Sequence, residues 1–92
     1  MSPLSEQHIA AQLKSVPAWK VIAGELTRTF TFKDFRESLG FVNKVGELAE
    51  GAGHHPDIDI RYNRVRLALV THDAGGLTAK DFDLASAVDK LV

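Results

Sequence analysis

The sequence contains no cysteine, and this absence excludes two kinds of stabilising chemistry. Neither a disulfide framework nor a thiolate metal site can form, and nothing indicates an oxidising compartment, so the sequence predicts a cytoplasmic protein. Long apolar runs are missing too, since no stretch approaches the ~20 residues that a membrane-spanning helix requires. The first residues, MSPLSEQHIAAQLK, lack the basic start and apolar core of a signal peptide. We therefore expect a soluble protein with no membrane partner.

An excess of charge of one sign is also missing. The chain has 11 basic and 12 acidic side chains and a formal net charge of -1, so no overall field favours a phosphate backbone or an anionic lipid. The one local basic group is Arg61, Arg64 and Arg66, and Asp57 and Asp59 lie just before it. We interpret this group as a solvated strand face and expect no nucleic-acid partner.

The length limits the domain organisation. With 92 residues, of which 45% are hydrophobic, residues 1–92 have room for a single domain with one core. A chain this short buries only about two-thirds of the surface that it exposes when unfolded, so self-association is a natural way to bury more. We expect a homodimer or a homotetramer.

Apolar residues recur at helical spacing in three segments and alternate in four others. Ser5, Thr31 and Thr78 are the predicted caps of the three helices, and Gly51 and Gly53 are expected to end the second. In chain order we predict a helix over 6–14, strands over 19–23 and 25–32, a helix from 35 to 49, strands over 57–63 and 64–71, and a helix over 79–91.

Short turns join the predicted strands in pairs, at Ala23-Gly24 and around Asn63, where Asn tolerates a left-handed backbone. Two hairpins, each followed by a helix, favour an antiparallel four-stranded sheet with helices packed on one face. The predicted class is α+β, in the order α-β-β-α-β-β-α. Arg28 interrupts an apolar strand face, so we expect its stem to lie along the sheet edge.

Three of the four histidines lie at the ends of these elements. His54 and His55 occupy the loop before the third strand, and His72 ends the fourth. Because these two strands pair through a short turn, the start of one lies beside the end of the other, and the three imidazoles are expected to meet. Imidazole, with an unperturbed pKa of about 6.5, both gives and takes protons near neutral pH. Topology alone leaves acid–base catalysis and ordinary surface packing both open.

A zinc site is the other use of three histidines. Glu50 and Asp73 are available as oxygen ligands. Against zinc, the adjacent His54 and His55 direct their side chains apart in extended backbone, and the usual i, i+4 pairing on a helix is absent.

The spaced motif Glu50-x3-His54-His55-Pro56-x5-Tyr62-x9-His72-x8-Asp81 resembles the signature of the pterin-4a-carbinolamine dehydratases. The resemblance extends through Tyr62-Asn63-x-Val65, Leu69-x-Thr71-His72-Asp73, Gly75-Gly76-Leu77-Thr78 and, upstream, Pro17-x-Trp19. It therefore spans nearly the whole chain. One departure is Gly53, where some relatives carry an acidic or larger residue.

The resemblance implies dehydration of a 4a-hydroxytetrahydropterin to the quinonoid dihydropterin, without metal or organic cofactor, which recycles the cofactor of aromatic amino acid hydroxylases. By motif position, the catalytic residues are His54 and His72 as the proton-transfer pair and His55, which chiefly holds the pterin. The expected substrate-binding residues are Glu50, Asp73, Trp19, Pro56 and Thr71.

Some of these residues have a second interpretation. Glu50 and Asp73 are candidates to orient an imidazole, and Trp19 either walls the pocket or packs in the core. Asp81 matches the motif, but its position three residues after Thr78 explains it fully as a helix cap.

Two rival functions stay open. The first is a binding module, because some members of this family also act as dimerisation partners of a transcription factor through a helix face. The second is a homologue that binds a pterin or related ring without turnover, including a role in molybdopterin metabolism.

Overall fold

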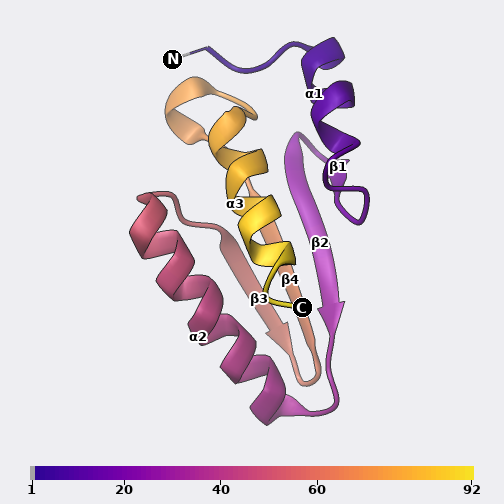
Figure 1. Ribbon diagram of the computed structural model, residues 1–92, viewed down its shortest axis with the longest axis vertical. Helices are drawn as coiled ribbons and strands as arrows, with labels where there is room; N and C mark the ends of the chain where they lie inside the picture. Colours follow the sequence, from indigo (N-terminus) through magenta and orange to yellow (C-terminus); the bar gives the residue numbers. More distant parts are fainter. Residues whose placement is uncertain (1) are drawn as a thin grey trace.

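Figure 1 shows the computed structural model, which describes residues 2–92. The helices and strands follow one another in the predicted order, with one short 3-10 turn inserted before the last helix. Their bounds are α1 Glu6–Leu13, β1 Lys20–Ile22, β2 Glu25–Thr31, α2 Phe35–Ala52, β3 Asp57–Arg61, β4 Arg64–Leu69, the 3-10 turn His72–Ala74 and α3 Ala79–Asp89.

The four strands form one antiparallel sheet in the order β1-β2-β4-β3. The two hairpins therefore meet along β2 and β4. The first hairpin turns where predicted, at Ala23 and Gly24, whose φ angles of 52° and 79° are the left-handed values that a two-residue hairpin loop requires. The predicted α+β class and the four-stranded antiparallel sheet are confirmed.

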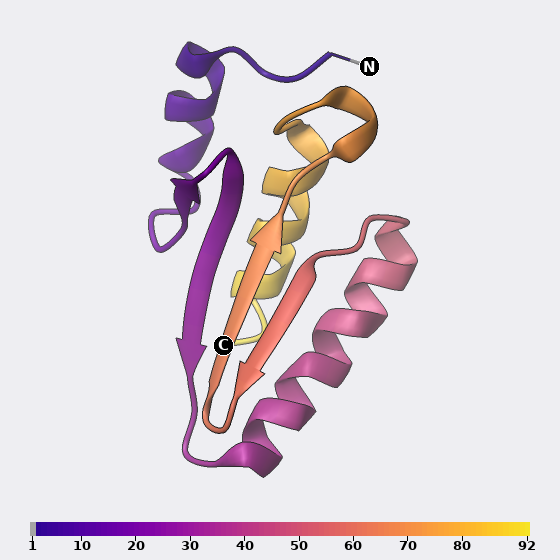
Figure 2. The ribbon, with the colours of Figure 1, turned by 180° about the vertical axis from the view of Figure 1, so that it is seen from behind.

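Helices α2 and α3 cover one face of the sheet, and the view from behind shows the strands in front of α3 (Figures 1 and 2). Alternate residues of β2 and β4 point toward these helices because side chains alternate across a strand. Burying each large apolar side chain contributes about 1.5–3 kcal/mol. The core consists mainly of Leu26, Phe30, Val65, Leu67 and Leu69 from the sheet and Phe41, Val45, Phe82, Leu84 and Val88 from the helices.

The caps of α1 and α3 are those predicted. The Ser5 hydroxyl accepts from the backbone N–H of His8, and Thr78 with Asp81 forms a capping box. The predicted cap of α2 was wrong: Asp34, not Thr31, is its N-cap, and its carboxylate accepts from the backbone N–H of Glu37 at 2.9 Å. No helix in the described part of the chain is long and apolar enough to cross a bilayer.

Two further expectations are corrected. In the second hairpin the left-handed residue is Tyr62, with φ 52°, whereas Asn63 donates its side-chain amide to the carbonyl of Phe32. Arg28 does not simply lie along the edge: its Nη1 pairs with Asp89 Oδ1 at 2.6 Å, and its guanidinium lies 4.2 Å from the centroid of the Phe30 ring. Asp89 thus pairs with the positive charge of Arg28, whose place on the apolar strand face the sequence pattern did not explain.

The ends of α2 and β4 decide where the histidines lie. Gly53 ends α2 in a left-handed conformation, with φ 62°, and turns the chain back toward β3. β4 ends at Leu69, earlier than predicted, because Thr71 instead bridges to Gly76 and closes a small loop. His72 therefore begins the 3-10 turn and does not end the strand.

Candidate active site

Three segments meet at one end of the sheet: the loop after α2, the loop after β4, and the first turn of α3. The antiparallel register brings the first two together, since Asp57 at the start of β3 lies opposite Ala68 near the end of β4. Three residues before Asp57 is His54, and four after Ala68 is His72. The predicted gathering of these loops thus follows from strand pairing alone.

All three predicted catalytic histidines line one hollow of about 270 Å³. Asp73 and Thr71, two of the expected binding residues, line it as well. Its complete lining is Gly53, His54, His55, Val70, Thr71, His72, Asp73 and Lys80.

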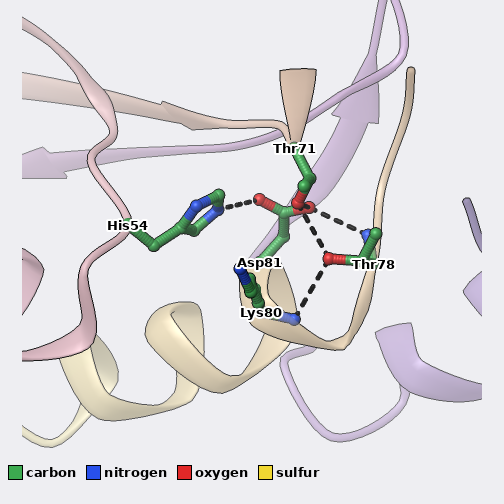
Figure 3. Close-up of polar contacts among 5 residues, drawn as sticks. All are labelled: His54, Thr71, Thr78, Lys80 and Asp81. Carbon is green, nitrogen blue, oxygen red and sulfur yellow. Dashed lines mark hydrogen bonds and ion pairs between the residues drawn. The ribbon is translucent and has the colours of Figure 1, made fainter. Parts of the chain in front are cut away.

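His54 is the imidazole that the protein holds most firmly. Only 12% of its side chain is exposed, and its Nε2–H donates to Asp81 Oδ1 at 2.5 Å (Figure 3). A carboxylate partner fixes both the tautomer and the orientation of an imidazole. Since Nε2 is engaged, Nδ1 is the nitrogen left to exchange a proton with a ligand.

Asp81 is fully buried, at 0% exposure, and its second oxygen is also satisfied. Oδ2 accepts from the Thr78 backbone N–H at 2.9 Å and from the Thr71 hydroxyl at 2.8 Å. Because Thr71 gives its only hydroxyl proton to Asp81, the Thr78 hydroxyl donates to Thr71 at 2.8 Å, and it accepts from the Lys80 N–H. Figure 3 shows this chain of contacts. They fix the orientation of the Asp81 carboxylate and thereby the position of the oxygen that accepts from His54.

His55 and His72 are held more loosely. His55 Nε2 contacts Glu50 Oε2, but the two side chains are 60% and 76% exposed, so the solvent screens this pair. His72 is exposed on the 3-10 turn, beside Asp73. The hollow therefore combines one fixed imidazole with two that have room to adjust to a ligand.

The structure places the other expected binding residues outside the lining of this hollow. Trp19 is 3% exposed within the core, where its Nε1–H donates to Asp89 Oδ1 at 2.8 Å and its ring meets Phe30 edge-on. Its interpretation as a core residue therefore holds, and its interpretation as a pocket wall does not. Pro56 is half-buried before β3, and Glu50 reaches the site only through His55.

Sequence reasoning left two residues out of the site. Asp81 matched the motif but was interpreted as a helix cap and was not included among the expected site residues. Lys80 lines the hollow from the first turn of α3; the signal that could have found it is its place immediately before Asp81. Within residues 2–92, the structure has no group of three or more His, Asp or Glu side chains arranged to hold a metal ion.

A family model described as pterin 4 alpha carbinolamine dehydratase matches residues 2–91. Proteins from Acidobacterium capsulatum and Chloroflexus aurantiacus, each provisionally named pterin-4-alpha-carbinolamine dehydratase, are 61% and 59% identical to this chain over 92 residues. These alignments cover 100% of this chain and 100% and 99% of the two relatives.

Two solved structures are similar as well. A crystal structure of a transcriptional coactivator/pterin dehydratase from Brucella melitensis has a TM-score of 0.93 and 32% identity, with 98% of both chains covered. A pterin dehydratase-like protein described as a RuBisCO assembly factor in the alpha-carboxysome has a TM-score of 0.64 and 23% identity, over 79% of this chain and 84% of that one. The second likeness shows a common fold only.

Proposed function

The chain belongs to the pterin 4 alpha carbinolamine dehydratase family, and on that basis we propose that it converts a 4a-hydroxytetrahydropterin into the quinonoid dihydropterin and water. The observation that carries the proposal is the hollow in which His54, His55 and His72 meet. Its volume of about 270 Å³ suits a flat bicyclic ring. Polar groups converging in a concave site are typical of small-molecule binding.

The reaction requires two proton transfers on one small ring. An acid protonates the hydroxyl on C4a, a base removes the proton from N5, and the N5–H electrons form the C4a–N5 double bond as the C4a–O bond breaks. Water leaves, and no electron is gained or lost overall. Two imidazoles in opposite protonation states are sufficient, so the chemistry needs no cofactor.

The surroundings of the histidines support a division of roles. His54 is the base, because the buried Asp81 carboxylate stabilises the positive charge that develops when His54 Nδ1 takes the N5 proton. His72, exposed and free to follow the substrate, is the acid that protonates the hydroxyl. His55, backed by Glu50, holds the ring.

Family membership also supports a proposal for the wider role. A quinonoid dihydropterin is the form from which the cofactor of aromatic amino acid hydroxylases is regenerated by reduction, so this chain would act between hydroxylation and reduction. Homodimeric or homotetrameric assembly and a cytoplasmic location stay predictions of the sequence.

The decisive experiment measures the decay of 4a-hydroxytetrahydropterin absorbance with and without protein. We expect His54→Ala and His72→Ala each to slow turnover by roughly a hundredfold or more, the usual effect of losing a positioned acid or base. The matched control is His8→Ala, since His8 is the fourth histidine and lies exposed on α1, away from the hollow.

Turnover within threefold of wild type in both site variants would refute the catalytic assignment. A chelator arm tests the zinc alternative, because activity that survives exhaustive chelation cannot depend on a bound metal. Pterin binding without turnover would instead favour the binding-only homologue.

A further inference from the structure

We infer that the segment before α1, Pro3 and Leu4, positions His72 for its proton transfer by holding the base of the loop that carries it. This inference rests on the proposed function, since it concerns one of the three histidines in the hollow. Pro3 and Leu4 do not line the hollow themselves, so they are positioning residues that act through His72. The inference also gives a structural reason for the motif Gly75-Gly76-Leu77-Thr78.

His72 lies on a small closed loop. Thr71 and Gly76 pair as an isolated antiparallel bridge, in which the Thr71 N–H donates to the Gly76 carbonyl at 3.2 Å. Between these two residues, His72 and Asp73 are exposed. The place of His72 is therefore set mainly by the contacts at the base of the loop.

The two sides of this base differ in stiffness. On one side, the hydroxyl of the buried Thr71 donates to Asp81 Oδ2 at 2.8 Å. On the other side are two consecutive glycines, Gly75 and Gly76, and glycine loses more conformational freedom on folding than any other residue. The glycine side therefore gains most from a restraint that another segment supplies.

The segment before α1 supplies this restraint. The Leu4 N–H donates to the Leu77 carbonyl at 2.8 Å, and the half-buried Leu4 side chain packs against the core cluster to which Leu77 belongs. In both ribbon views this segment, in indigo, passes along the loop, in orange (Figures 1 and 2). The glycine side of the loop is thus tied to the core through Leu4.

Pro3 lies directly against Gly76. A Cβ added at Gly76 would lie 3.0 Å from the Pro3 Cβ, whereas two carbon atoms in favourable contact are about 3.5–4.0 Å apart. The missing side chain at Gly76 lets Pro3 approach, and it also leaves the loop backbone free to move. The same position therefore explains why the loop needs a restraint and how Pro3 reaches it.

The restraint bears on the chemistry because an acid must come within hydrogen-bond reach of the hydroxyl that it protonates. Misplacing a reacting group by about 1 Å can slow a reaction by roughly a hundredfold. The His72 side chain can adjust to a ligand, but only from the place at which the loop holds its backbone. Loosening the segment should therefore lower kcat more than it raises KM.

The test removes the side chain that anchors the segment and compares Leu4→Ala with Ile9→Ala. Ile9 is the matched control, since it also packs partly buried against the core but does so from within α1. Both variants should lower the melting temperature by similar amounts, because each loses the apolar contacts of one partly buried side chain. Only Leu4→Ala should lower kcat, by roughly tenfold, which corresponds to a displacement of His72 by about 0.5 Å.

Two further kinetic readouts separate positioning from stability. KM should change by less than about twofold in Leu4→Ala, because His54 and His55 still hold the ring and the lost interaction belongs to the transition state. Leu4→Met keeps an apolar side chain of similar volume, so it should restore kcat to within about twofold of wild type.

Amide hydrogen exchange gives a readout that does not depend on turnover. The Thr71 amide, which bonds to Gly76 across the base of the loop, reports opening of that base. Its exchange should be roughly tenfold faster in Leu4→Ala and unchanged in Ile9→Ala, each measured relative to the amide of Val65. Val65 is fully buried in the central strand β4, so this ratio corrects for the stability of the whole domain.

Three outcomes would overturn the inference. Unchanged exchange at Thr71 in Leu4→Ala would mean that the segment does not hold the loop. Faster exchange with unchanged kcat would mean that it holds the loop without positioning His72. Equal losses of kcat in Leu4→Ala and Ile9→Ala would mean that only the stability of the fold is involved. If the wild type turns over no 4a-hydroxytetrahydropterin, the proposed function itself fails, which is a separate and visible result.

Discussion

Replacing Asp81 by asparagine should separate the stability of the fold from turnover. The Thr78 backbone N–H can only donate, so the asparagine oxygen must take the place of Oδ2 and keep this hydrogen bond and the one from Thr71. The asparagine NH2 group then faces His54 Nε2, where the carboxylate oxygen accepted before. His54 keeps a hydrogen bond only as the tautomer that carries its proton on Nδ1, and that tautomer cannot take a proton from the substrate.

Asp81→Asn should lower the stability of the fold slightly and the turnover strongly. Asp81→Asn preserves the number of hydrogen bonds and weakens a charge-assisted one, which costs about 1 kcal/mol and lowers the melting temperature by about 4–8 °C for a domain of this size. Turnover should fall by up to about 10⁴, as it does when the carboxylate behind a catalytic histidine of a serine protease becomes an amide. Asp81→Ala should lose the activity and also about 2–4 kcal/mol, because it removes a helix cap and leaves a buried N–H unpaired.

The assay pairs thermal unfolding, followed by circular dichroism, with dehydration kinetics on the same preparations. Asp34→Ala is the control, since it removes another carboxylate cap, at the opposite end of α2 from His54, and should cost about 0.5–2 kcal/mol with no loss of turnover. An Asp81→Asn protein that turns over substrate within threefold of wild type would refute the role given to this carboxylate.

Two further predictions concern stability. Gly53→Ala adds a Cβ at a position with φ 62°, and this Cβ meets no heavy atom within 4 Å. The substitution should therefore cost only the backbone strain of the left-handed conformation, about 1–2 kcal/mol. A fall in melting temperature of less than 2 °C would contradict this expected strain. Asp89→Ala removes the carboxylate that accepts from both Trp19 Nε1–H and the Arg28 guanidinium. Because the Arg28–Asp89 ion pair is partly exposed, we expect the free energy of unfolding in urea to fall by only about 1–2 kcal/mol, with altered tryptophan fluorescence. An unchanged urea midpoint would show that water replaces the acceptor without cost.

The order and type of the elements were predictable because they depend on local signals. Strand alternation, helical spacing and turn residues act over a few positions, and each agreed with its neighbours along the chain. The choice between competing local signals was not predictable. Thr31 and Asp34 each precede an acidic residue by three positions, and the sheet decides between them, since Thr31 pairs with Arg64 and so belongs to β2.

The left-handed residue of the second hairpin shows the same limit. Asparagine tolerates positive φ better than tyrosine does, which favoured Asn63 on local grounds. In the fold, Asn63 lies beside the end of β2: its side chain donates to the carbonyl of Phe32, and its own carbonyl accepts from the Phe32 N–H at 2.7 Å. These contacts occupy Asn63, and Tyr62 takes the strained position.

The meeting of the histidines was predictable from topology, but their unequal support was not. Antiparallel pairing of β3 with β4 is sufficient to bring His54 and His72 to one end of the sheet. Which imidazole has a buried partner depends on how α3 packs against the sheet, and sequence spacing does not report that packing. The one fixed imidazole is therefore a property of the tertiary structure.

Asp81 caps helix α3 and also holds His54, although the capping role alone accounts for its place in the sequence. Capping α3 occupies only one carboxylate oxygen, Oδ2, which accepts from Thr78. The other oxygen stays available, and His54 binds it from a loop 27 residues away in sequence. Since a carboxylate has two oxygens and a cap needs one, a buried capping carboxylate beside a cluster of titratable groups has an oxygen left for another donor. In this fold, the start of α3 and the orientation of His54 therefore depend on the same side chain.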